Sequence, residues 1–392
     1  MTTVMSPPAH SYLEAARELL PLIRSEAATA ESQGHMTDAV VEAFHASGLQ
    51  QMLVTEDLGG GGHELPAMLP VTQLLASADA ASGWSLMFAM MGPTFGQLLP
   101  RASYEAIFSS AHASITGALA PTGVSADATD GGYIVSGKSS YNSAHRFASH
   151  LFFGGVVRRN GQVNITNGMP ELRGFVVAKS EVTIIPNWPA SAMVATESDD
   201  AVIDKVFVSD EFTFPFIGAV SSWRDGAART MPLLSMLGVG LAAIAVGAAR
   251  GCLDCFRETA VSKVPAGGMT RLAEQAGAQI AFAEAEGTWM AAEAVLQNSA
   301  RDAWAKAGSG EPFGQQDMAR LRLGAVTATR LSKRTIDMVR DYSGMSVVLR
   351  GSPMERLARD TGAVTQHVAV AAHRYENCGR VLFGLAPNGP ML

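Results

Sequence analysis

Cysteine, charge and basic stretches are all scarce in this chain of 392 residues. It has 3 cysteines, and only 17% of its residues are charged. A small, odd number of cysteines argues against a disulfide framework. The formal net charge is -7 and no basic block is present, so we do not expect nucleic acid as a partner. The chain also begins without a basic stretch followed by an apolar one, and we expect a cytoplasmic protein.

Metal-binding and nucleotide-binding patterns are missing as well. The 9 histidines include no pair with ligand spacing, so no metal is expected. Gly238–Ala243 has the letters of a dinucleotide fingerprint, but no strand precedes it and no βαβ unit follows. Cys252 and Cys255 have redox or zinc spacing but lack a second ligand pair. We interpret both features as parts of ordinary helices.

One uncharged run, Met231–Ala249, is long enough to cross a bilayer. Its many glycines and alanines make it weakly apolar per residue, and small side chains favour close packing between helices. The run therefore predicts a buried helix of a bundle, and we expect no membrane contact.

The spacing of apolar residues divides the chain into three segments. Helical spacing predicts an α-helical domain over residues 1–112. Strands separated by turns such as Asp130–Gly132 and Arg159–Gly161 predict a β domain over residues 113–215. Helical spacing returns over residues 216–392, which predicts an antiparallel bundle. The fold class expected from this order is α+β with segregated layers.

Several short strings occur in a fixed order along these segments. They are Ala78–Trp84, Gly117–Gly123, Asp130–Lys138, Tyr141–Ala144, Asn187–Trp188 with Ala195–Ser198, and Arg359–Asp360 with His367. In this order the strings resemble the acyl-CoA dehydrogenase superfamily, in particular its branch of two-component flavin-dependent monooxygenases. The resemblance spans nearly the whole chain.

The resemblance implies an acyl-CoA dehydrogenase-like fold, with an N-terminal helical domain, a central β-barrel or sandwich and a C-terminal four-helix bundle. It also implies a monooxygenase that receives reduced FMN or FAD from a separate flavin reductase. Such an enzyme would use O2 to oxygenate a small organic substrate that is aromatic, an amine or bound as a thioester. The family further implies a homo-oligomer, expected to be a tetramer.

The same resemblance assigns candidate site residues. It places Ser143 at the N5 edge of the flavin, where its hydroxyl would hydrogen-bond the ring, although a serine in a turn is more often only a turn residue. The expected cofactor contacts are Trp84, Pro121, Thr122, Gly123, Asn142, Ser143, Trp188, Thr196, Ser198 and Arg359. Arg359 and Asp360 could equally form an ion pair that fixes the last helices.

His367 is the second catalytic candidate. It lies in the apolar stretch Val364–Ala372, which we predict to be helical, and a histidine there is more often part of the core. Its ordinary pKa is near neutrality, so it could accept a substrate proton or hydrogen-bond the oxygenated flavin. The match to a histidine that follows Arg-Asp in the family favours a catalytic role. His373 would face away from His367 on such a helix, and we expect it to be structural.

Two alternatives stay open at this point. One is an acyl-CoA dehydrogenase or oxidase. No acid lies between Asp360 and Glu376, where the family's dehydrogenases commonly carry their base, so Glu284 or Glu286 would have to supply it. The other is a relative of the fold that binds flavin or another ligand without catalysis.

Overall fold

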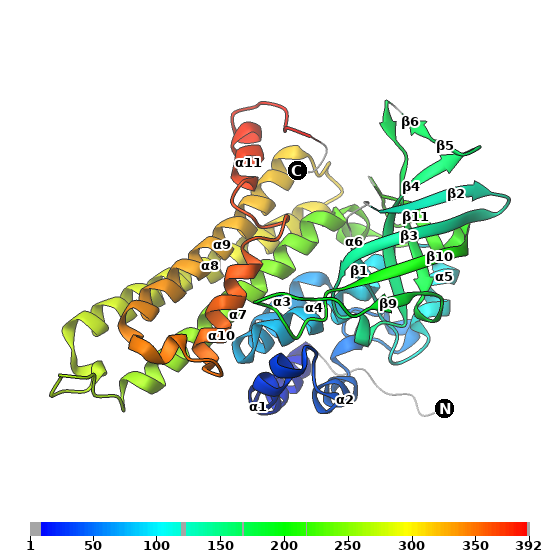
Figure 1. Ribbon diagram of the computed structural model, residues 1–392. Coiled ribbons are helices and arrows are strands. Elements are labelled where there is room, and N and C mark those ends of the chain that lie inside the picture. Colours follow the sequence, from blue (N-terminus) through cyan, green and yellow to red (C-terminus); the bar gives the residue numbers. More distant parts are fainter. Residues whose placement is uncertain (1–8, 119–122, 167, 217, 390–392) are drawn as a thin grey trace.

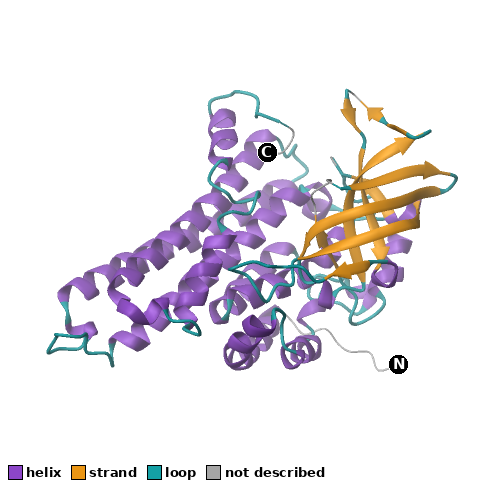
Figure 2. Cartoon of the chain, viewed as in Figure 1, coloured by secondary structure: helices purple, strands orange, loops and turns teal. Residues whose placement is uncertain are grey.

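The computed structural model describes residues 9–118, 123–166, 168–216 and 218–389. Helices form the first and last parts of the chain, and the strands between them form a sheet at one end of the long C-terminal helices (Figures 1 and 2). The change from helix to strand falls between Phe108 and Ile115, and the return to helix falls between Pro215 and Gly226. The predicted order, and with it the α+β class, is confirmed.

The N-terminal helices pack around α3 and α4, which both contact the long helix α7. Asp79 caps α4, because its Oδ2 accepts from Ser82 N at 2.9 Å and from Ser82 Oγ at 2.7 Å. This satisfies donors that the first turn of a helix leaves free. The elements are α1 (Ala9–Gln33), α2 (Asp38–Ser47), η1 (Leu49–Gln51), η2 (Glu56–Leu58), α3 (Leu65–Ala78), α4 (Ala80–Gly96) and α5 (Arg101–Phe108).

The central part forms a nine-stranded sheet in the order β11-β8-β4-β2-β3-β10-β9, with β1 and β5 also paired to β4. Both β1 and β2 run parallel to β4, and the other pairs in this sheet are antiparallel. The strands are β1 (Ile115–Ala118), β2 (Val124–Thr129), β3 (Gly132–Asn142), β4 (His150–Arg159), β5 (Gln162–Val163), β8 (Leu172–Ala178), β9 (Thr183–Ile185), β10 (Asp199–Ser209) and β11 (Thr213–Pro215), with β6 (Ile165–Thr166) and β7 (Met169–Pro170) paired separately.

The predicted turns lie where the sequence places them. Asn160 (φ 52°) and Gly161 (φ 76°) connect β4 to β5, and positive φ at both central residues matches the twist of a tight hairpin. Gly131 (φ 72°) turns the chain between β2 and β3. The two predicted turns are therefore confirmed, and each joins the strands of an antiparallel hairpin.

The C-terminal helices run lengthwise beside one another (Figure 1). In the most apolar stretch of α7, 94% of the residues are buried, so the prediction of a buried bundle helix is confirmed. A Cβ on Gly247 would lie 2.1 Å from the Gln73 carbonyl oxygen, and glycine thus allows α7 and α3 to approach closely. The elements are α6 (Gly226–Thr230), α7 (Leu233–Ala260), η6 (Leu272–Glu274), α8 (Ala276–Gly308), α9 (Gln315–Ser343), η7 (Gly344–Val348), α10 (Pro353–Val364) and α11 (Arg374–Leu382).

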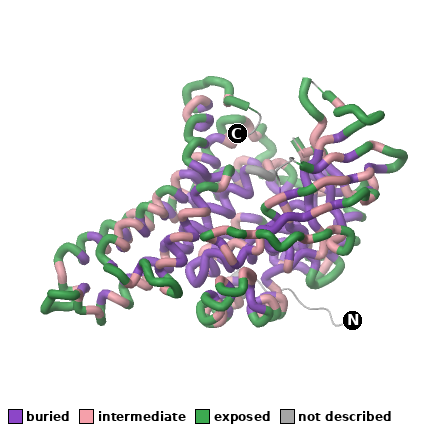
Figure 3. The backbone as a smooth tube through the Cα atoms, viewed as in Figure 1, coloured by how far each residue is buried: buried purple, intermediate pink, exposed green. Residues whose placement is uncertain are grey.

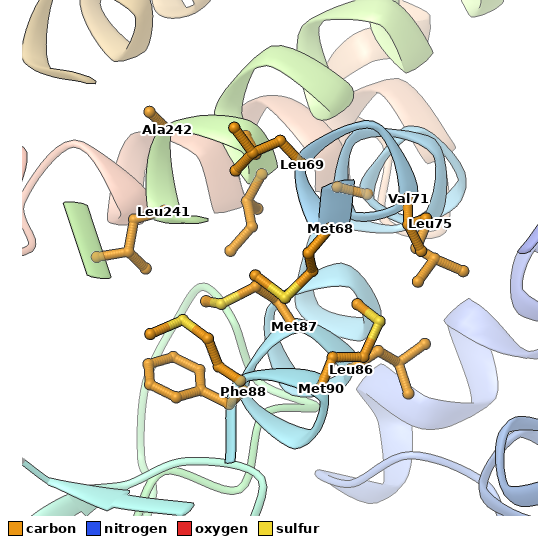
Figure 4. Packing of buried hydrophobic residues seen from close by; sticks show 14 of the residues in the cluster. Met68, Leu69, Val71, Leu75, Leu86, Met87, Phe88, Met90, Leu241 and Ala242 are labelled. Atoms are coloured by element: carbon orange, nitrogen blue, oxygen red, sulfur yellow. The ribbon is translucent and has the colours of Figure 1, made fainter. Parts of the chain in front are cut away.

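One apolar core joins the first and last parts of the chain. Met68 and Leu69 of α3, Met87 of α4 and Leu241 of α7 meet in it (Figure 4), and the buried backbone concentrates where these helices cross (Figure 3). A second cluster lies within the sheet, around Val135 and Phe153. Because the two helical parts share a core, the division at residues 112 and 215 into three domains stays a prediction.

The predicted helix over Val364–Ala372 is wrong. Helix α10 ends at Val364, and the following residues form a series of turns up to α11. The physical reason is local hydrogen bonding, because Thr365 Oγ1 donates to the Gly362 carbonyl and Ala369 N donates to His367 Nδ1. His367 is therefore held in a turn rather than on a helix face.

Candidate active site

Three hydroxyl groups form a continuous hydrogen-bond chain where β3 ends. Ser143 Oγ lies 2.7 Å from Ser198 Oγ, which lies 2.7 Å from Thr196 Oγ1. Thr196 Oγ1 donates in turn to the Met193 carbonyl oxygen at 2.8 Å. All three side chains are buried, at 7% exposure or less. The structure thus brings together three of the predicted residues.

The direction of donation along this chain follows from its last member. The Met193 carbonyl can only accept, so the Thr196 proton points to it. Thr196 Oγ1 then accepts from Ser198, and Ser198 accepts from Ser143. The Ser143 proton is therefore committed, while the lone pairs of its oxygen are left to accept a hydrogen bond from a bound molecule.

Aromatic rings lie beside this chain of hydroxyls. Trp188 Nε1 donates to the same Met193 carbonyl at 2.9 Å, and the Trp188 ring meets Tyr141 edge-on at 5.9 Å between centroids. Tyr141 is 66% exposed and has a positive φ of 68°. A planar group could pack against these rings next to Ser143. Met193, which accepts from both Thr196 and Trp188, was not predicted, because a methionine side chain gives no sign that its backbone matters.

The neighbouring predicted residues hold the backbone in place. Asn142 is fully buried, and its Nδ2 donates to the Ser139 and Asp199 carbonyls, which ties β3 to β10. Gly123 (φ 88°) packs against Lys138, where a Cβ would lie 2.3 Å from the carbonyl oxygen. Their contacts with a cofactor stay predictions. Pro121 and Thr122 lie outside the described residues.

A second set of predicted residues comes together between α4 and the turns after α10. The rings of Trp84 and His367 meet at 66° with 5.7 Å between centroids, and Phe88 lies 5.5 Å from Trp84. Trp84 Nε1 is buried and has no hydrogen-bond partner among the residues that the structure describes. A buried indole N–H usually has one. Trp84 thus offers an unused donor beside His367.

His367 is held as a neutral ring. Its Nδ1 accepts from Ala369 N at 3.1 Å, so the ring proton of the neutral form lies on Nε2. Burial lowers the pKa of His367 to about 4, and the positive charge of Arg374 contributes to the shift. The expectation that His367 titrates near neutrality is therefore wrong. The geometry favours a hydrogen-bond donor at Nε2 over a general base.

The guanidinium of Arg359 bonds mainly to other parts of the protein. It donates from Nε to Glu355 at 2.9 Å, from Nη2 to Glu31, and from Nη1 to the Ser191 carbonyl at 2.5 Å. Its Nη1 also lies 3.6 Å from Asp360 Oδ1, which is the ion pair that the sequence left open as an alternative. A phosphate contact by Arg359 stays a prediction from the resemblance.

Asp360 connects the two sets of residues. It is 1% exposed, and its Oδ1 accepts from Met193 N at 2.7 Å. Burial raises the pKa of Asp360 to about 7, with a further contribution from Asp79. Since Asp360 lies on α10 just before the His367 turns, the bond joins those turns to the carbonyl that ends the hydroxyl chain.

A buried ion pair also fixes α4 against α10. Arg356 Nε lies 2.9 Å from Asp79 Oδ1, and the two residues are 4% and 1% exposed. Asp79 is also the cap of the helix that carries Trp84. The relative positions of Trp84 and His367 therefore depend on this pair.

The alternative catalytic bases lie elsewhere. Glu284 is exposed on α8, and Glu286 forms two hydrogen bonds with Arg250. Neither contacts the two sets of residues described above, so the structure offers no support for an acyl-CoA dehydrogenase base on α8.

One group within the described ranges could in principle hold a metal. His145, Glu197 and Asp199 bring their ligand atoms within 4.8 Å of one another. Arg146 already binds Glu197 through two nitrogens, and Asp199 accepts from His145 at 3.1 Å. The group is accounted for as an ion-pair network.

Comparisons with known proteins identify relatives over most of the chain. A family model described as "Acyl-CoA dehydrogenase, C-terminal domain" matches residues 239–372. The chain is 28% identical to an indole-3-acetate monooxygenase of Pseudomonas putida, over 94% of this chain and 93% of that protein. It is also 28% identical to the flavin-dependent monooxygenase oxygenase subunit HsaA of Mycobacterium tuberculosis, over the full length of both. The crystal structure of an HsaA monooxygenase from M. tuberculosis superposes with a TM-score of 0.87 and 26% identity, covering 98% of this chain and all of the other.

Proposed function

We propose that this chain, which belongs to the acyl-CoA dehydrogenase superfamily and there to the two-component flavin-dependent monooxygenases, oxygenates a small organic substrate at a site that includes Ser143 and His367. The observation that carries the proposal is the hydroxyl chain that leaves Ser143 Oγ as a hydrogen-bond acceptor. The resemblance implies small aromatic compounds or amines as substrates, and either class could pack against the neighbouring rings of Trp84 and Phe88.

The cofactor of this enzyme is a reduced flavin, which it uses with O2. When bound, a reduced flavin activates O2 so that one oxygen atom reaches the substrate and the other leaves as water. The residues present fit such a ring. Ser143 Oγ suits the N–H at position 5 of a reduced flavin, and Trp188 and Tyr141 supply aromatic surface beside it.

Ser143 is proposed to hold the flavin N5–H, and Ser198 and Thr196 are proposed to keep Ser143 oriented as an acceptor. His367 and Trp84 are proposed to face the substrate from the other side. Trp84 presents a buried N–H, and His367 presents its Nε2–H from a half-buried ring; shielding from water makes such hydrogen bonds stronger. His367 Nε2 would stabilise the oxygen atoms as they are transferred, and the apolar wall around Phe88 would exclude water.

Assembly as a homotetramer in the cytoplasm is also part of the proposal. Large apolar side chains are exposed in the segment between α7 and α8 and in the segment between α9 and α10. An oligomer would cover them. They are Val261, Val264, Met269, Met345, Val348 and Leu349, each more than 50% exposed.

Dependence on a separate reductase provides the test of the proposed function. The purified protein with FMN or FAD and NADH or NADPH should oxidise almost no nicotinamide, because its one dinucleotide-like string lies inside the buried helix α7. Addition of an unrelated flavin reductase should start O2 consumption and product formation with a suitable phenol, indole or amine. Rapid nicotinamide oxidation by this chain alone would contradict the proposal.

The direction of donation along the hydroxyl chain can be tested at Ser198, the hydrogen-bond partner of Ser143. Ser198→Ala removes the acceptor of the Ser143 proton, so Ser143 is free to turn its own proton toward the ring. We expect more of the reduced flavin to be lost as hydrogen peroxide, with flavin affinity lowered only about 2- to 10-fold, as for loss of one neutral hydrogen bond. The ratio of product to peroxide is the measurement.

Ser149→Ala is a matched control, because Ser149 also accepts and donates hydrogen bonds at a strand end but lies outside the chain. It should leave the ratio unchanged. An equal loss of product in both variants would mean that the Ser143 chain has no special role.

A further inference from the structure

A buried arginine near His367 has unused hydrogen-bond donors. Arg322 on α9 is 4% exposed, and in the described part of the chain neither its Nε nor its Nη2 has a hydrogen-bond partner. Within the described residues, no carboxylate pairs with it. Burial lowers its pKa to about 10, and the charge of Arg374 contributes, so the guanidinium still carries its charge at neutral pH. A buried charge without a partner destabilises a fold, and such groups usually have a role in binding.

The neighbouring helix α7 carries a second buried donor, Ser235 Oγ, that has no partner among the described residues. A Cβ built on Gly238 of α7 would touch the Cβ of Ala325 on α9 at 3.9 Å, which shows where the two helices meet. Ser235 and Arg322 each lie one turn before these contacting residues. Ser235 is 4% exposed, and its Oγ is buried without a partner. Both of these buried donors therefore lie about one helical turn from the place where α7 and α9 meet.

The turns that carry His367 pack against α7 next to its contact with α9. A Cβ on Gly238 would also lie 3.5 Å from the Ala369 carbonyl oxygen. Arg374, which begins α11, donates from Nε to the Val368 carbonyl at 2.5 Å, and its charge acts on both Arg322 and His367. Positive potential is thus concentrated next to the His367 ring, on the side of α7 and α9.

We propose that Arg322, with Ser235 beside it and Arg374 close by, binds the carboxylate of the substrate and so selects small aromatic acids. This inference rests on the proposed function, since it names the substrate class of that site. A carboxylate matches the fork of an arginine, and it would satisfy the unused donors. Held there, the acid end of the substrate would leave its ring between Trp84 and His367, where we place the oxygen transfer.

A flavin phosphate is the other anion that could reach the pocket. The position of Arg322 favours the substrate, because the charge of Arg374 acts on both Arg322 and His367. The test below separates the two sources of negative charge.

The experiment measures equilibrium binding to the purified protein. No reduced flavin is present, so no turnover takes place. The probes are aromatic acids of one to three rings, each paired with its neutral amide, together with FMN and riboflavin, which lacks the phosphate. In the unaltered protein at least one acid should bind more tightly than its amide. In Arg322→Met that acid should bind about 10- to 100-fold more weakly, as expected for loss of a charge-assisted hydrogen bond, while its amide is unaffected.

Two further variants keep the test decisive. Arg320→Met removes an exposed arginine of the same helix and should change no affinity. Arg322→Lys keeps the charge without the fork, and its affinity for the acid should lie between those of the other two. The melting temperature of Arg322→Met without ligand should be equal to or higher than that of the unaltered protein, because an unpaired buried charge is removed.

Three results would overturn the inference. One is that no acid binds more tightly than its amide. Another is that Arg322→Met abolishes the preference for FMN over riboflavin, which would assign the site to the flavin phosphate. The third is that Arg322→Met lowers the melting temperature, as loss of a core side chain does, while the variant still binds the acid more tightly than the amide. Because no oxygen chemistry is involved, any of these could occur while reductase-dependent turnover remains intact.

Discussion

Replacement of His367 by alanine is expected to lower the rate of product formation about 10²- to 10³-fold. The reason is the loss of the Nε2 donor of a half-buried ring, at the place where we propose that charge develops on the oxygen being transferred. A donor that is partly shielded from water contributes more than the same group in water. Product formation under single-turnover conditions, with reduced flavin, O2 and substrate, is the measurement, and hydrogen peroxide should account for the lost product.

The glutamine variant separates a donor from a base. His367→Gln keeps an N–H at about the reach of Nε2 but cannot act as a base near neutrality, so a donor role predicts partial recovery. His373→Ala is the matched control, because His373 is exposed in the same segment. The donor role is contradicted if glutamine is as poor as alanine, or if product formation in the unaltered protein falls with a titration near pH 6.5.

The pKa of His367 also has a consequence for stability. Its pKa is about 4 in the folded protein and about 6.5 in the unfolded chain, so between these values the unfolded chain binds the extra proton. The His367 contribution to the free energy of unfolding therefore rises with pH across this window. Asp360 acts in the opposite direction, because its pKa is raised to about 7 and the folded state holds its proton as the pH rises from about 4.

Residues that are close together in the sequence determine much of the architecture. The alternation in Gly132–Gly137 and the Asn160–Gly161 turn specify a hairpin through nearest neighbours alone, and β3, β4 and β5 follow them. The small residues of Met231–Ala249 likewise determine how closely α7 can approach α3. These features depend on residues close together in the chain, which is why the sequence predicts them.

The site depends on contacts between distant residues, and there the sequence is a weaker guide. Residue type and resemblance found Ser143, Thr196 and Ser198, yet the direction of the hydroxyl chain depends on the carbonyl of Met193. Arg322 carried no signal, since only the folded chain buries it without a partner. The helix predicted through His367 failed because side-chain hydrogen bonds from Thr365 and to His367 compete with the backbone.

The buried pair of Asp79 and Arg356 should have the largest effect on stability. Arg356→Met leaves the Asp79 carboxylate buried without its cation, and we expect the free energy of unfolding to fall by about 3 to 5 kcal/mol. Asp79→Asn leaves Arg356 with only the more distant Glu31, at 3.8 Å, and should also lower stability, although asparagine can still cap α4. Urea unfolding at fixed protein concentration, followed by circular dichroism, measures both.

The double variant decides whether the pair acts as a unit. With both charges removed, no uncompensated charge stays buried, so Asp79→Asn with Arg356→Met should be clearly more stable than the sum of the single changes predicts. Arg101→Met, which breaks an exposed ion pair with Asp57, is the control and should change stability little. Additive losses at Asp79 and Arg356 would mean that each side chain acts through packing alone. Since the pair joins the helix of Trp84 to the helix that leads into His367, the folded single variants should also release more hydrogen peroxide per product, which packing elsewhere in the bundle would not cause.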